Sequence, residues 1–253
     1  PRPHHRDFGH CQSLSCAPWS RQPLAETPPM RHPAPLSWTE NGTPVSTRFD
    51  DPYFTIGAGL AETRHVFLTG NDLPARYRDG FHIAELGFGT GLNLLAALAC
   101  WSGPGQLRFT SFEAFPLPPE DMVRALAAFD LPGAAVLVAA WEQAQGPVRV
   151  LDLPGMRAEI HIGDARETLP RWSGLADAWF LDGFSPAKNP ELWDDALMAE
   201  VARHTAPGGT FATYTAAGHV RRALAGAGFA VTRQPGFGRK KHMTSGRLEG
   251  PRA

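Results

Sequence analysis

The 253-residue sequence predicts an α/β protein built on a doubly wound, mostly parallel sheet. Two observations support this fold class: from Phe81 onward, apolar strand-like segments alternate with helix-like segments, and at 81–93 a strand, a tight glycine turn and a helix follow one another. A hydrophobic content of 43% allows a full core. The formal net charge is −1, so any nucleic-acid partner would need a local basic patch.

Residues 1–35 are rich in proline and lack apolar periodicity, which predicts a disordered tail. Cys11 and Cys16 lie there near several histidines, but their spacing matches no standard zinc site, so we expect no metal. Natural translation is hypothesised to begin at Met30. The three cysteines form no disulfide framework, and no apolar run reaches the length of a membrane span. We therefore expect a soluble cytoplasmic protein.

Residues 36–80 predict a small appendage of a hairpin and a helix. Asn41-Gly42 suits a tight turn between two short strands. A helix is expected at 59–68, closed by Gly70. Because this piece is too small to fold alone, it should pack on the main sheet as a lid or brace.

Residues 81–246 carry the alternating pattern, and 247–253 form a short C-terminal tail. A hairpin should precede the third strand, because a Pro154-Gly155 turn follows Val148–Leu151, and 236–244 should form a final antiparallel strand. The other strands are expected at 81–86, 107–113, 157–162, 177–182, 209–214 and 229–233, and the helices at 91–101, 119–129, 134–142, 190–204 and 217–227.

The glycine turn after the first of these strands predicts a nucleoside-bearing ligand lying against bare backbone and helix N-terminal N–H groups. Leu92 occupies the position where a dinucleotide fingerprint has Gly or Ala, which favours a ligand without a pyrophosphate. A purely structural corner is the alternative. The candidate cofactor residues are Glu85, Gly87, Phe88, Gly89, Gly91 and Asn93.

Two acids follow the next strands. Glu113 ends the second strand, where a carboxylate can accept hydrogen bonds from ribose hydroxyls, although a surface acid would look the same. Asp164, followed by Ala165, comes after the third strand and could accept the adenine amino group. Asp164 is equally placed to cap the helix that follows.

The fourth strand ends at Asp182 and continues into Gly183-Phe184-Ser185-Pro186, a loop too irregular to be a simple connection. An acid at a strand end among aromatic residues is similar to the acid-x-x-aromatic motif of amino-group methyltransferases. Asp182 and Phe184 are the candidate catalytic residues, with Phe184 packing on the substrate, and Asp182 is also a candidate cofactor-binding residue. The alternatives are a loop-capping Asp182 and a core Phe184.

Basic residues near the predicted cleft could contact phosphate, although charge runs are more often solvated faces. The fifth strand ends at Tyr214 beside the same cleft. The candidate RNA-binding residues are Tyr53, Lys188, Tyr214, Arg221, Arg222, Arg239, Lys240 and Lys241.

From about Leu36 to Gly246 the chain resembles the methyltransferase part of the bacterial tRNA 5-methylaminomethyl-2-thiouridine methyltransferase family. The Leu181–Pro190 run is its most specific match. The other matching segments are Asp50–Phe54, Glu62–Leu68 with Gly70-Asn71, Glu85–Asn93, Phe112–Leu117, Asp177–Trp193, Pro207–Thr210, Ala217–Arg222 and Gly236–Met243.

This resemblance implies a Rossmann-like methyltransferase that uses S-adenosylmethionine to methylate the primary amine of 5-aminomethyl-(2-thio)uridine at the tRNA wobble position. Many members also carry a flavin-dependent oxidase domain. This chain has no second nucleotide fingerprint, so it resembles a stand-alone form or a fragment, and a separate oxidase acting on the same base is an expected partner.

The chemistry assigns a hypothetical role to each candidate catalytic residue. An alkylamine has a pKa of about 10 and must lose a proton before it can accept a methyl group. Asp182 would orient the amine and stabilise its charge, with or without taking the proton, while Phe184 packs on the uracil. The alternatives are a small-molecule methyl or aminopropyl transferase of the same fold, and a non-catalytic RNA-binding module.

Overall fold

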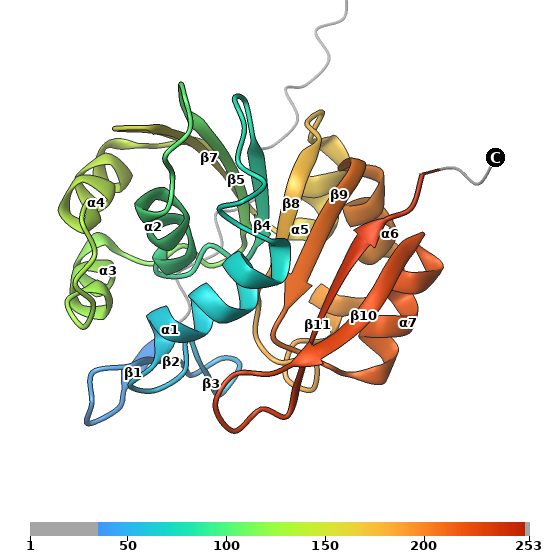
Figure 1. Ribbon diagram of the computed structural model, residues 1–253. Coiled ribbons are helices and arrows are strands. Elements are labelled where there is room, and N and C mark those ends of the chain that lie inside the picture. The colour runs from blue at the N-terminus through green and yellow to red at the C-terminus, as the bar shows by residue number, and fades with distance from the viewer. Residues whose placement is uncertain (1–34, 251–253) are drawn as a thin grey trace, which may run out of the picture. The chain divides into compact units, whose positions relative to one another are not determined.

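The computed structural model describes residues 35–250 and places them in two sheets flanked by helices (Figure 1). The smaller sheet is antiparallel, in the order β1-β2-β3. Asn41-Gly42 lies in the β1–β2 turn, and Gly42 has a φ of 75°, as the hairpin prediction requires. The strands of this sheet are β1 (Leu36–Trp38), β2 (Pro44–Ser46) and β3 (Asp51–Pro52).

The main sheet has the order β10-β11-β9-β8-β4-β5-β7-β6. Strands β7, β5, β4, β8 and β9 run parallel, while β6 and β11 are antiparallel to their neighbours. The predicted doubly wound, mostly parallel sheet is therefore confirmed, as is the β6–β7 hairpin. The strands are β4 (His82–Leu86), β5 (Leu107–Glu113), β6 (Val148–Leu153), β7 (Met156–Ile162), β8 (Ala176–Leu181), β9 (Thr205–Thr213), β10 (Phe229–Pro235) and β11 (His242–Leu248).

The winding direction of the chain reverses between two central strands. The chain runs outward from β4 through β5 to the β6–β7 hairpin at the edge of the sheet, and then returns to β8 on the other side of β4. In sheets of this kind, ligands bind outside the carboxyl ends of the strands at this switch point. The glycine turn that follows β4 and the Asp182 loop that follows β8 meet there.

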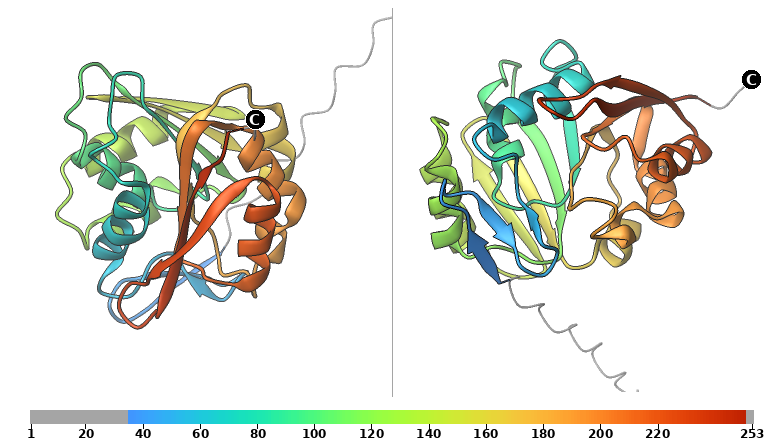
Figure 2. Two further views of the ribbon diagram at one scale, coloured as in Figure 1. Left: turned by 45° about the vertical axis from the view of Figure 1, so that its right-hand side comes forward. Right: turned by 90° about the horizontal axis from the view of Figure 1, so that it is seen from below.

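Helices cover both faces of the main sheet (Figure 2). One buried cluster packs α2, α3, α4 and the segment after α1 on one face, and a second packs α5, α6 and α7 on the other. The helices are α1 (Gly59–Thr63), α2 (Leu92–Ala99), α3 (Pro119–Leu126), α4 (Ala134–Gln143), α5 (Ala165–Thr168), α6 (Asp195–Arg203) and α7 (Gly218–Gly226), with short helical turns at Arg64–Leu68, Thr69–Asn71, Leu169–Arg171 and Pro190–Trp193.

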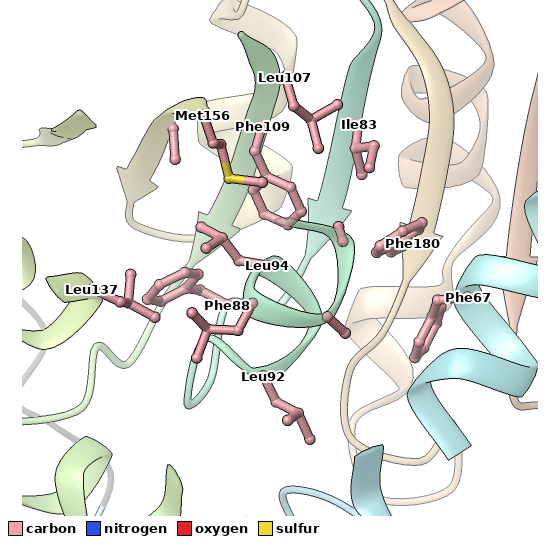
Figure 3. Close-up of a cluster of buried hydrophobic side chains, with 14 of the residues drawn as sticks. Phe67, Ile83, Phe88, Leu92, Leu94, Leu107, Phe109, Leu137, Met156 and Phe180 are labelled. Carbon is pink, nitrogen blue, oxygen red and sulfur yellow. The ribbon is translucent and has the colours of Figure 1, made fainter. Parts of the chain in front are cut away.

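Along each buried strand, successive side chains point alternately into the two clusters. Phe180 of β8 faces the first cluster, whereas its neighbours Trp179 and Leu181 face the second. In the first cluster, shown in Figure 3, Phe67 packs on Phe180 with their ring centroids 5.4 Å apart. The appendage predicted at 36–80 therefore contributes side chains directly to the main core.

Several boundaries differ from the sequence-based prediction, among them the start of β9 at Thr205 and not 209, and three of the differences have a clear local cause. The last strand begins at His242, not 236, because Gly236–Lys241 forms the tight turn between β10 and β11, and it continues to Leu248. The helix predicted at 190–204 is interrupted where the Asp194 carboxylate accepts the Leu197 N–H and caps α6. Gly70 does not close its helix, because Asp72, with a φ of 57°, supplies the left-handed residue there.

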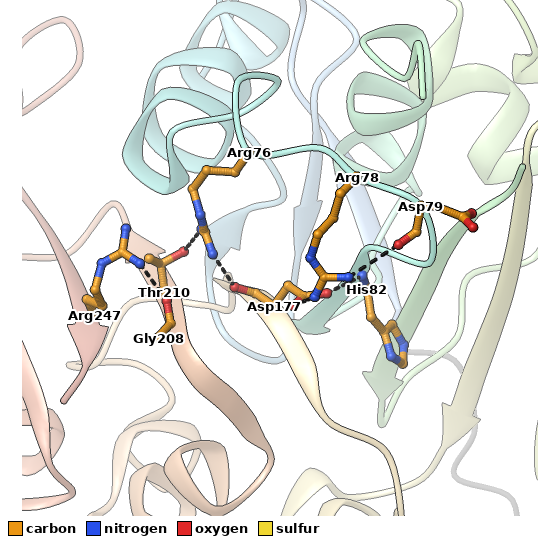
Figure 4. Close-up of polar contacts among 8 residues, drawn as sticks. All are labelled: Arg76, Arg78, Asp79, His82, Asp177, Gly208, Thr210 and Arg247. Carbon is orange, nitrogen blue, oxygen red and sulfur yellow. Dashed lines mark hydrogen bonds and ion pairs between the residues drawn. The ribbon is translucent and has the colours of Figure 1, made fainter. Parts of the chain in front are cut away.

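A polar cluster ties the strands together at the end of the sheet opposite the switch point (Figure 4). The half-buried Arg76 donates to Thr210 Oγ1 and, at 3.0 Å, to the Asp177 carbonyl. The Asp177 carboxylate accepts from Arg78 at 2.6 Å and from the His82 N–H at 2.9 Å. These contacts connect β4, β8 and β9 to the segment that precedes β4.

Within residues 35–250, no helix is both long enough and apolar enough to cross a membrane. The tail prediction for 1–35, including Cys11, Cys16 and Met30, lies outside the described residues except at Pro35.

Candidate active site

A pocket of about 860 Å³ opens at the carboxyl ends of the parallel strands. Its walls come from the glycine turn after β4, the ends of β5 and β8, helix α1, the segment after β3 and the β10–β11 turn. Figure 1 shows the small sheet and the β10–β11 turn at this same end of the main sheet. Segments far apart in the chain therefore enclose one site.

The glycine turn brings bare backbone against two parts of the pocket. Gly87 has a φ of 87°, and a Cβ there would lie 2.5 Å from the Asp182 carbonyl oxygen. Gly89 has a φ of 52°, and a Cβ there would lie 3.1 Å from the Tyr53 ring. Gly91 begins α2 with a φ of 80°, and its missing Cβ makes room for Leu137 in the core. Gly91 therefore shapes the turn without lining the pocket.

Glu113 is held rigidly at the end of β5. One carboxylate oxygen accepts the Gly89 N–H at 2.9 Å, and the other accepts the Phe115 N–H at 2.6 Å. Burial raises the pKa of Glu113, and these backbone hydrogen bonds oppose the rise. Because each oxygen keeps a lone pair, the carboxylate can still accept hydrogen bonds from a ligand in the pocket.

Asp164 and Ala165 also line the pocket. The Asp164 carboxylate caps α5 by accepting the Arg166 N–H at 3.0 Å, as the capping alternative predicted. The Arg166 guanidinium donates to both oxygens of the same carboxylate, at 3.0 and 2.7 Å. Asp164 thus presents to the pocket a carboxylate already engaged by an arginine, which the sequence pattern did not indicate.

Asp182 lies at the end of β8 and lines the pocket. Its Oδ2 accepts from Asn93 Nδ2 at 2.7 Å. Burial raises the pKa of Asp182 to about 7; the Asn93 hydrogen bond and the Lys240 cation lower it, and the nearby Glu62 carboxylate raises it. The group can therefore exchange a proton near neutral pH.

Aromatic side chains, including Phe184 from the loop that follows β8, form a wall of the same pocket. The Phe184 ring stacks on Phe49, with centroids 4.6 Å apart, and meets the edge of Tyr53 at 5.1 Å. The Arg48 guanidinium lies over Phe115 at 4.7 Å. These rings form a surface against which a flat base can pack.

Hydrogen bonds fix the backbone of this loop. The Tyr214 hydroxyl donates to the Gly183 carbonyl at 2.6 Å, and Trp193 Nε1 donates to the Phe184 carbonyl at 2.9 Å. The Ser185 N–H donates to Asp51 Oδ2 at 2.8 Å. The small N-terminal sheet therefore helps to hold the loop that carries Phe184.

Glu62 and Lys240 form an ion pair of 2.7 Å on the pocket wall. Glu62 also accepts from the Thr55 hydroxyl, and Lys240 lies 4.3 Å from the centre of the Tyr214 ring. The sequence pattern alone did not indicate a role for Glu62. Helical periodicity gives no signal for it, because its partner lies on the β10–β11 turn, 178 residues further along the chain.

The structure divides the other predicted residues between the pocket and its surroundings. Phe88, Asn93, Tyr53, Tyr214 and Arg239 line the pocket. The remaining candidates do not line it: Glu85 is buried behind it, and Lys188, Arg221, Arg222 and Lys241 lie outside it. Lys188 contacts the Asp50 carbonyl and carboxylate. The pocket also contains residues whose role the sequence pattern did not indicate: Phe49, Asp51, Glu62 and Phe115.

The pocket fits a cationic nucleoside ligand together with an amine. Glu113 at the end of β5 and Asp182 after β8 supply acidic groups, and these two strands lie on either side of β4. The aromatic wall favours cations and flat rings. Glu62 adds a third carboxylate that is neutralised by Lys240. This combination suits group transfer between a positively charged donor and an amino group.

Comparison with known proteins agrees with this geometry. A family model described as S-adenosyl-L-methionine-dependent methyltransferase matches residues 133–249. The "tRNA 5-methylaminomethyl-2-thiouridine biosynthesis bifunctional protein MnmC" of Caulobacter sp. (strain K31) is 47% identical over 223 residues, covering 82% of this chain and 37% of that protein. The protein of the same name from Aeromonas hydrophila is 48% identical over 236 residues, covering 85% and 35%. The chain thus spans little more than a third of these relatives.

Solved structures show the same fold. The crystal structure titled MNMC2 from Aquifex aeolicus superposes with a TM-score of 0.64 at 25% identity, covering 88% of this chain and 73% of that one. Spermidine synthase from Thermotoga maritima reaches a TM-score of 0.50 at 10% identity, a likeness of fold alone.

The fold and the pocket together define an S-adenosylmethionine-dependent methyltransferase, and S-adenosylmethionine is its cofactor. Within that class, the chain belongs to the family that includes the methyltransferase part of the bifunctional MnmC proteins. The resemblance drawn from the Leu181–Pro190 run and the glycine turn is therefore confirmed.

Proposed function

We propose that this chain transfers a methyl group from S-adenosylmethionine to the primary amine of 5-aminomethyl-(2-thio)uridine at the wobble position of tRNA. The printed names of the relatives support this substrate class. The observation that carries the proposal is Asp182, a carboxylate with a pKa of about 7 on the wall of the methyltransferase pocket. Such a group can bind an amine and take a proton from it.

The proposed cofactor contacts follow the strand ends. Backbone at Gly87 to Gly89 would lie against the nucleoside, and Glu113 would accept the ribose hydroxyls. Asp164 and Ala165 would face the adenine. When bound, S-adenosylmethionine supplies a methyl group activated by a sulfonium cation, which the acidic pocket favours electrostatically.

The proposed role of Asp182 follows from proton balance. An alkylammonium with a pKa of about 10 must lose one proton to expose the lone pair that forms the new N–C bond. The Asp182 carboxylate accepts that proton. Its raised pKa of about 7 is closer to the pKa of the amine than the ordinary value of 3.8 would be. Once that proton has passed on to solvent, the regenerated carboxylate would stabilise the charge that the nitrogen regains when the N–C bond forms and the S–CH3 bond of the sulfonium breaks.

Substrate binding is proposed to combine stacking with phosphate contacts. Phe184 and Phe49 would pack on the uracil. Tyr53, which contacts the Phe184 ring, and Tyr214, which donates to the Gly183 carbonyl, would hold these rings and their loop in place. Basic residues on the pocket wall and around it would bind the tRNA backbone: Arg239 and Lys240 from the wall, and Lys188, Arg221, Arg222 and Lys241 from outside it. A tRNA substrate implies a cytoplasmic enzyme, and a separate flavin-dependent oxidase would act on the same base.

The proposal is tested by incubating the full chain with methyl-labelled S-adenosylmethionine and tRNA that carries 5-aminomethyl uridine. Mass spectrometry of the digested nucleosides should show label on that uridine. The matched control is D182N, which has the same shape but cannot take the proton. Label appearing only on added polyamines or other small amines would support the small-molecule alternative, and cofactor binding without any transfer would support a non-catalytic module.

A further inference from the structure

Asn93, in the first turn of α2, joins two carboxylates that come from different strands. Its Nδ2 donates to Glu85 Oε1 at 2.9 Å and to Asp182 Oδ2 at 2.7 Å. Its Oδ1 accepts from the Thr63 hydroxyl at 2.9 Å. Because the carboxylates accept while the hydroxyl donates, only one orientation of the amide satisfies all three partners.

The side of Asn93 away from the pocket is firmly anchored. Glu85 is 1% exposed, and its second oxygen accepts from Ser111 Oγ at 2.8 Å. Burial raises the pKa of Glu85 well above its usual range, which favours the neutral acid there. Asp182, by contrast, lines the pocket. The network therefore connects an anchored, buried acid to one that can meet a ligand.

We propose that Asn93 is a positioning residue that fixes the carboxylate of Asp182 for the substrate amine, with Thr63 setting the orientation of its amide. The proposal rests on the proposed function of Asp182. By donating to Oδ2, Asn93 restricts rotation of the carboxylate, which the Gly183 backbone also hydrogen-bonds, while the group still lines the pocket. Both N–H groups of Asn93 are used on protein partners, so this residue does not act mainly as a cofactor contact, the role predicted from its place in the glycine turn.

Other charged or titratable groups also face Asp182 and stay in place when Asn93 is changed. Glu62 comes from α1, Lys240 from the β10–β11 turn, and Tyr214 follows β9. Glu85 remains behind the network. In N93A, which adds no charge, a change in the titration of Asp182 can therefore be assigned to the lost amide.

The test is a carboxyl-carbon NMR titration of the full chain, with the Asp182 signal assigned by its loss in D182N. Removing a hydrogen bond to the ionised form should raise the pKa of Asp182 by about one pH unit in N93A. N93D keeps the side-chain shape but replaces the donor with an oxygen, so its effect should be at least as large. An unchanged titration in a folded N93D protein would overturn the proposal.

Thr63 provides a milder, matched pair of variants. T63V has the shape of threonine without the hydroxyl, and should raise the pKa of Asp182 in the same direction by less. T63S keeps the hydroxyl and should return the titration towards that of the wild type. If N93A and N93D fail to fold, a T63V titration identical to T63S would by itself overturn the proposal.

Two further measurements separate competing roles. Calorimetry with S-adenosylmethionine that showed weaker binding in N93D, with Asp182 titrating as in the wild type, would assign Asn93 to the cofactor and overturn the proposal. A lower Tm alone, with the titration unchanged, would make it a structural residue. If the wild type fails to methylate the tRNA while the pKa of Asp182 still rises in N93A, the proposed function fails and the positioning of Asp182 stands.

Discussion

At the scale of single residues, the identity of one side-chain atom should decide activity at Asp182. D182N replaces a carboxylate oxygen with an amide and leaves the volume unchanged, so the pocket should keep its shape. We expect kcat/KM for methyl transfer to fall by about 10²–10⁴-fold because the general base is lost. Labelled methyl transfer measures this, and calorimetry should show cofactor affinity within a few-fold of the wild type.

The same substitution should stabilise the fold above neutral pH. Burial raises the pKa of Asp182 to about 7, so the folded protein binds this proton more tightly than the unfolded chain does. The resulting stability is fully present below about pH 4 and is lost as the pH rises through 7. Because Asn carries no charge, D182N should gain about 1–3 kcal/mol over the wild type at pH 8 after allowance for solvent screening.

Thermal unfolding at pH 8 and pH 5 measures this gain. The difference in Tm between D182N and the wild type should be larger at pH 8 than at pH 5. An equal difference at both values would show that Asp182 titrates in the folded protein as it does in the unfolded chain. A group that costs stability and is needed for transfer is typical of an active site.

At the scale of elements, the glycine turn is set by contact with β8 as much as by its ligand. In G87A the new Cβ would lie 2.5 Å from the Asp182 carbonyl oxygen, a backbone atom that cannot move without disturbing the loop. In G80A the φ of 68° is equally strained, but nothing lies within 4 Å of the new Cβ. We expect G80A to cost about 1–2 kcal/mol and G87A at least twice as much.

Denaturant unfolding of the two variants separates the free-energy cost of the steric contact from that of the backbone strain, because both positions require a left-handed residue. Equal losses of stability would mean that the loop after β8 can retreat from the turn. In that case glycine would be required at position 87 only because of its positive φ.

The β10–β11 turn should act on the pocket through charge. Lys240 pairs with Glu62, and its cation lowers the pKa of Asp182. K240M should therefore move the acidic limb of the pH–rate profile to higher pH by a few tenths of a unit to one unit. K241M removes a neighbouring exposed cation outside the pocket.

K241M should lower the affinity for tRNA and the salt dependence of binding. It should not move the acidic limb of the pH–rate profile. Steady-state rates across pH 5.5–9 compare the two variants at the same tRNA concentration relative to KM. A shift of the same size in both would show that general surface charge, and not the ion pair with Glu62, acts on Asp182.

The elements that sequence could predict are those defined by local pattern. The buried strands and the glycine turn follow from apolar runs and glycine spacing, and the Leu181–Pro190 run is specific enough to indicate the family. What could not be predicted depends on pairing between distant segments. Glu62 gains its environment from Lys240, and the Gly236–Lys241 turn takes its shape from the hairpin that β10 and β11 form across the edge of the sheet. The local sequence around a residue does not indicate which distant segment that residue will contact.

At the scale of the whole molecule, the sheet separates chemistry from stability. The carboxyl ends of the parallel strands form the pocket, where glycine turns and acidic groups raise the free energy of the folded state. At the opposite end, Arg76 donates to Thr210 of β9 and to the Asp177 carbonyl of β8, and the Asp177 carboxylate accepts from Arg78 and from the His82 N–H of β4. These hydrogen bonds connect three strands. The two ends are joined mainly by buried apolar residues such as Phe180 and Ile83.

R76A tests this separation because it removes donors from the far end without touching the pocket. Losing the bonds to Thr210 and to the Asp177 carbonyl leaves half-buried acceptors unpaired, at a cost of about 2–4 kcal/mol and a fall in Tm of roughly 5–15 °C. At 25 °C, where the variant is still folded, kcat/KM should stay within about twofold of the wild type. D182N should do the reverse, keeping or raising Tm while activity is lost. A large fall in kcat/KM for a folded R76A would mean that strain at the far end of β8 reaches Asp182 through the strand itself, and that the sheet transmits, rather than isolates, changes between its two ends.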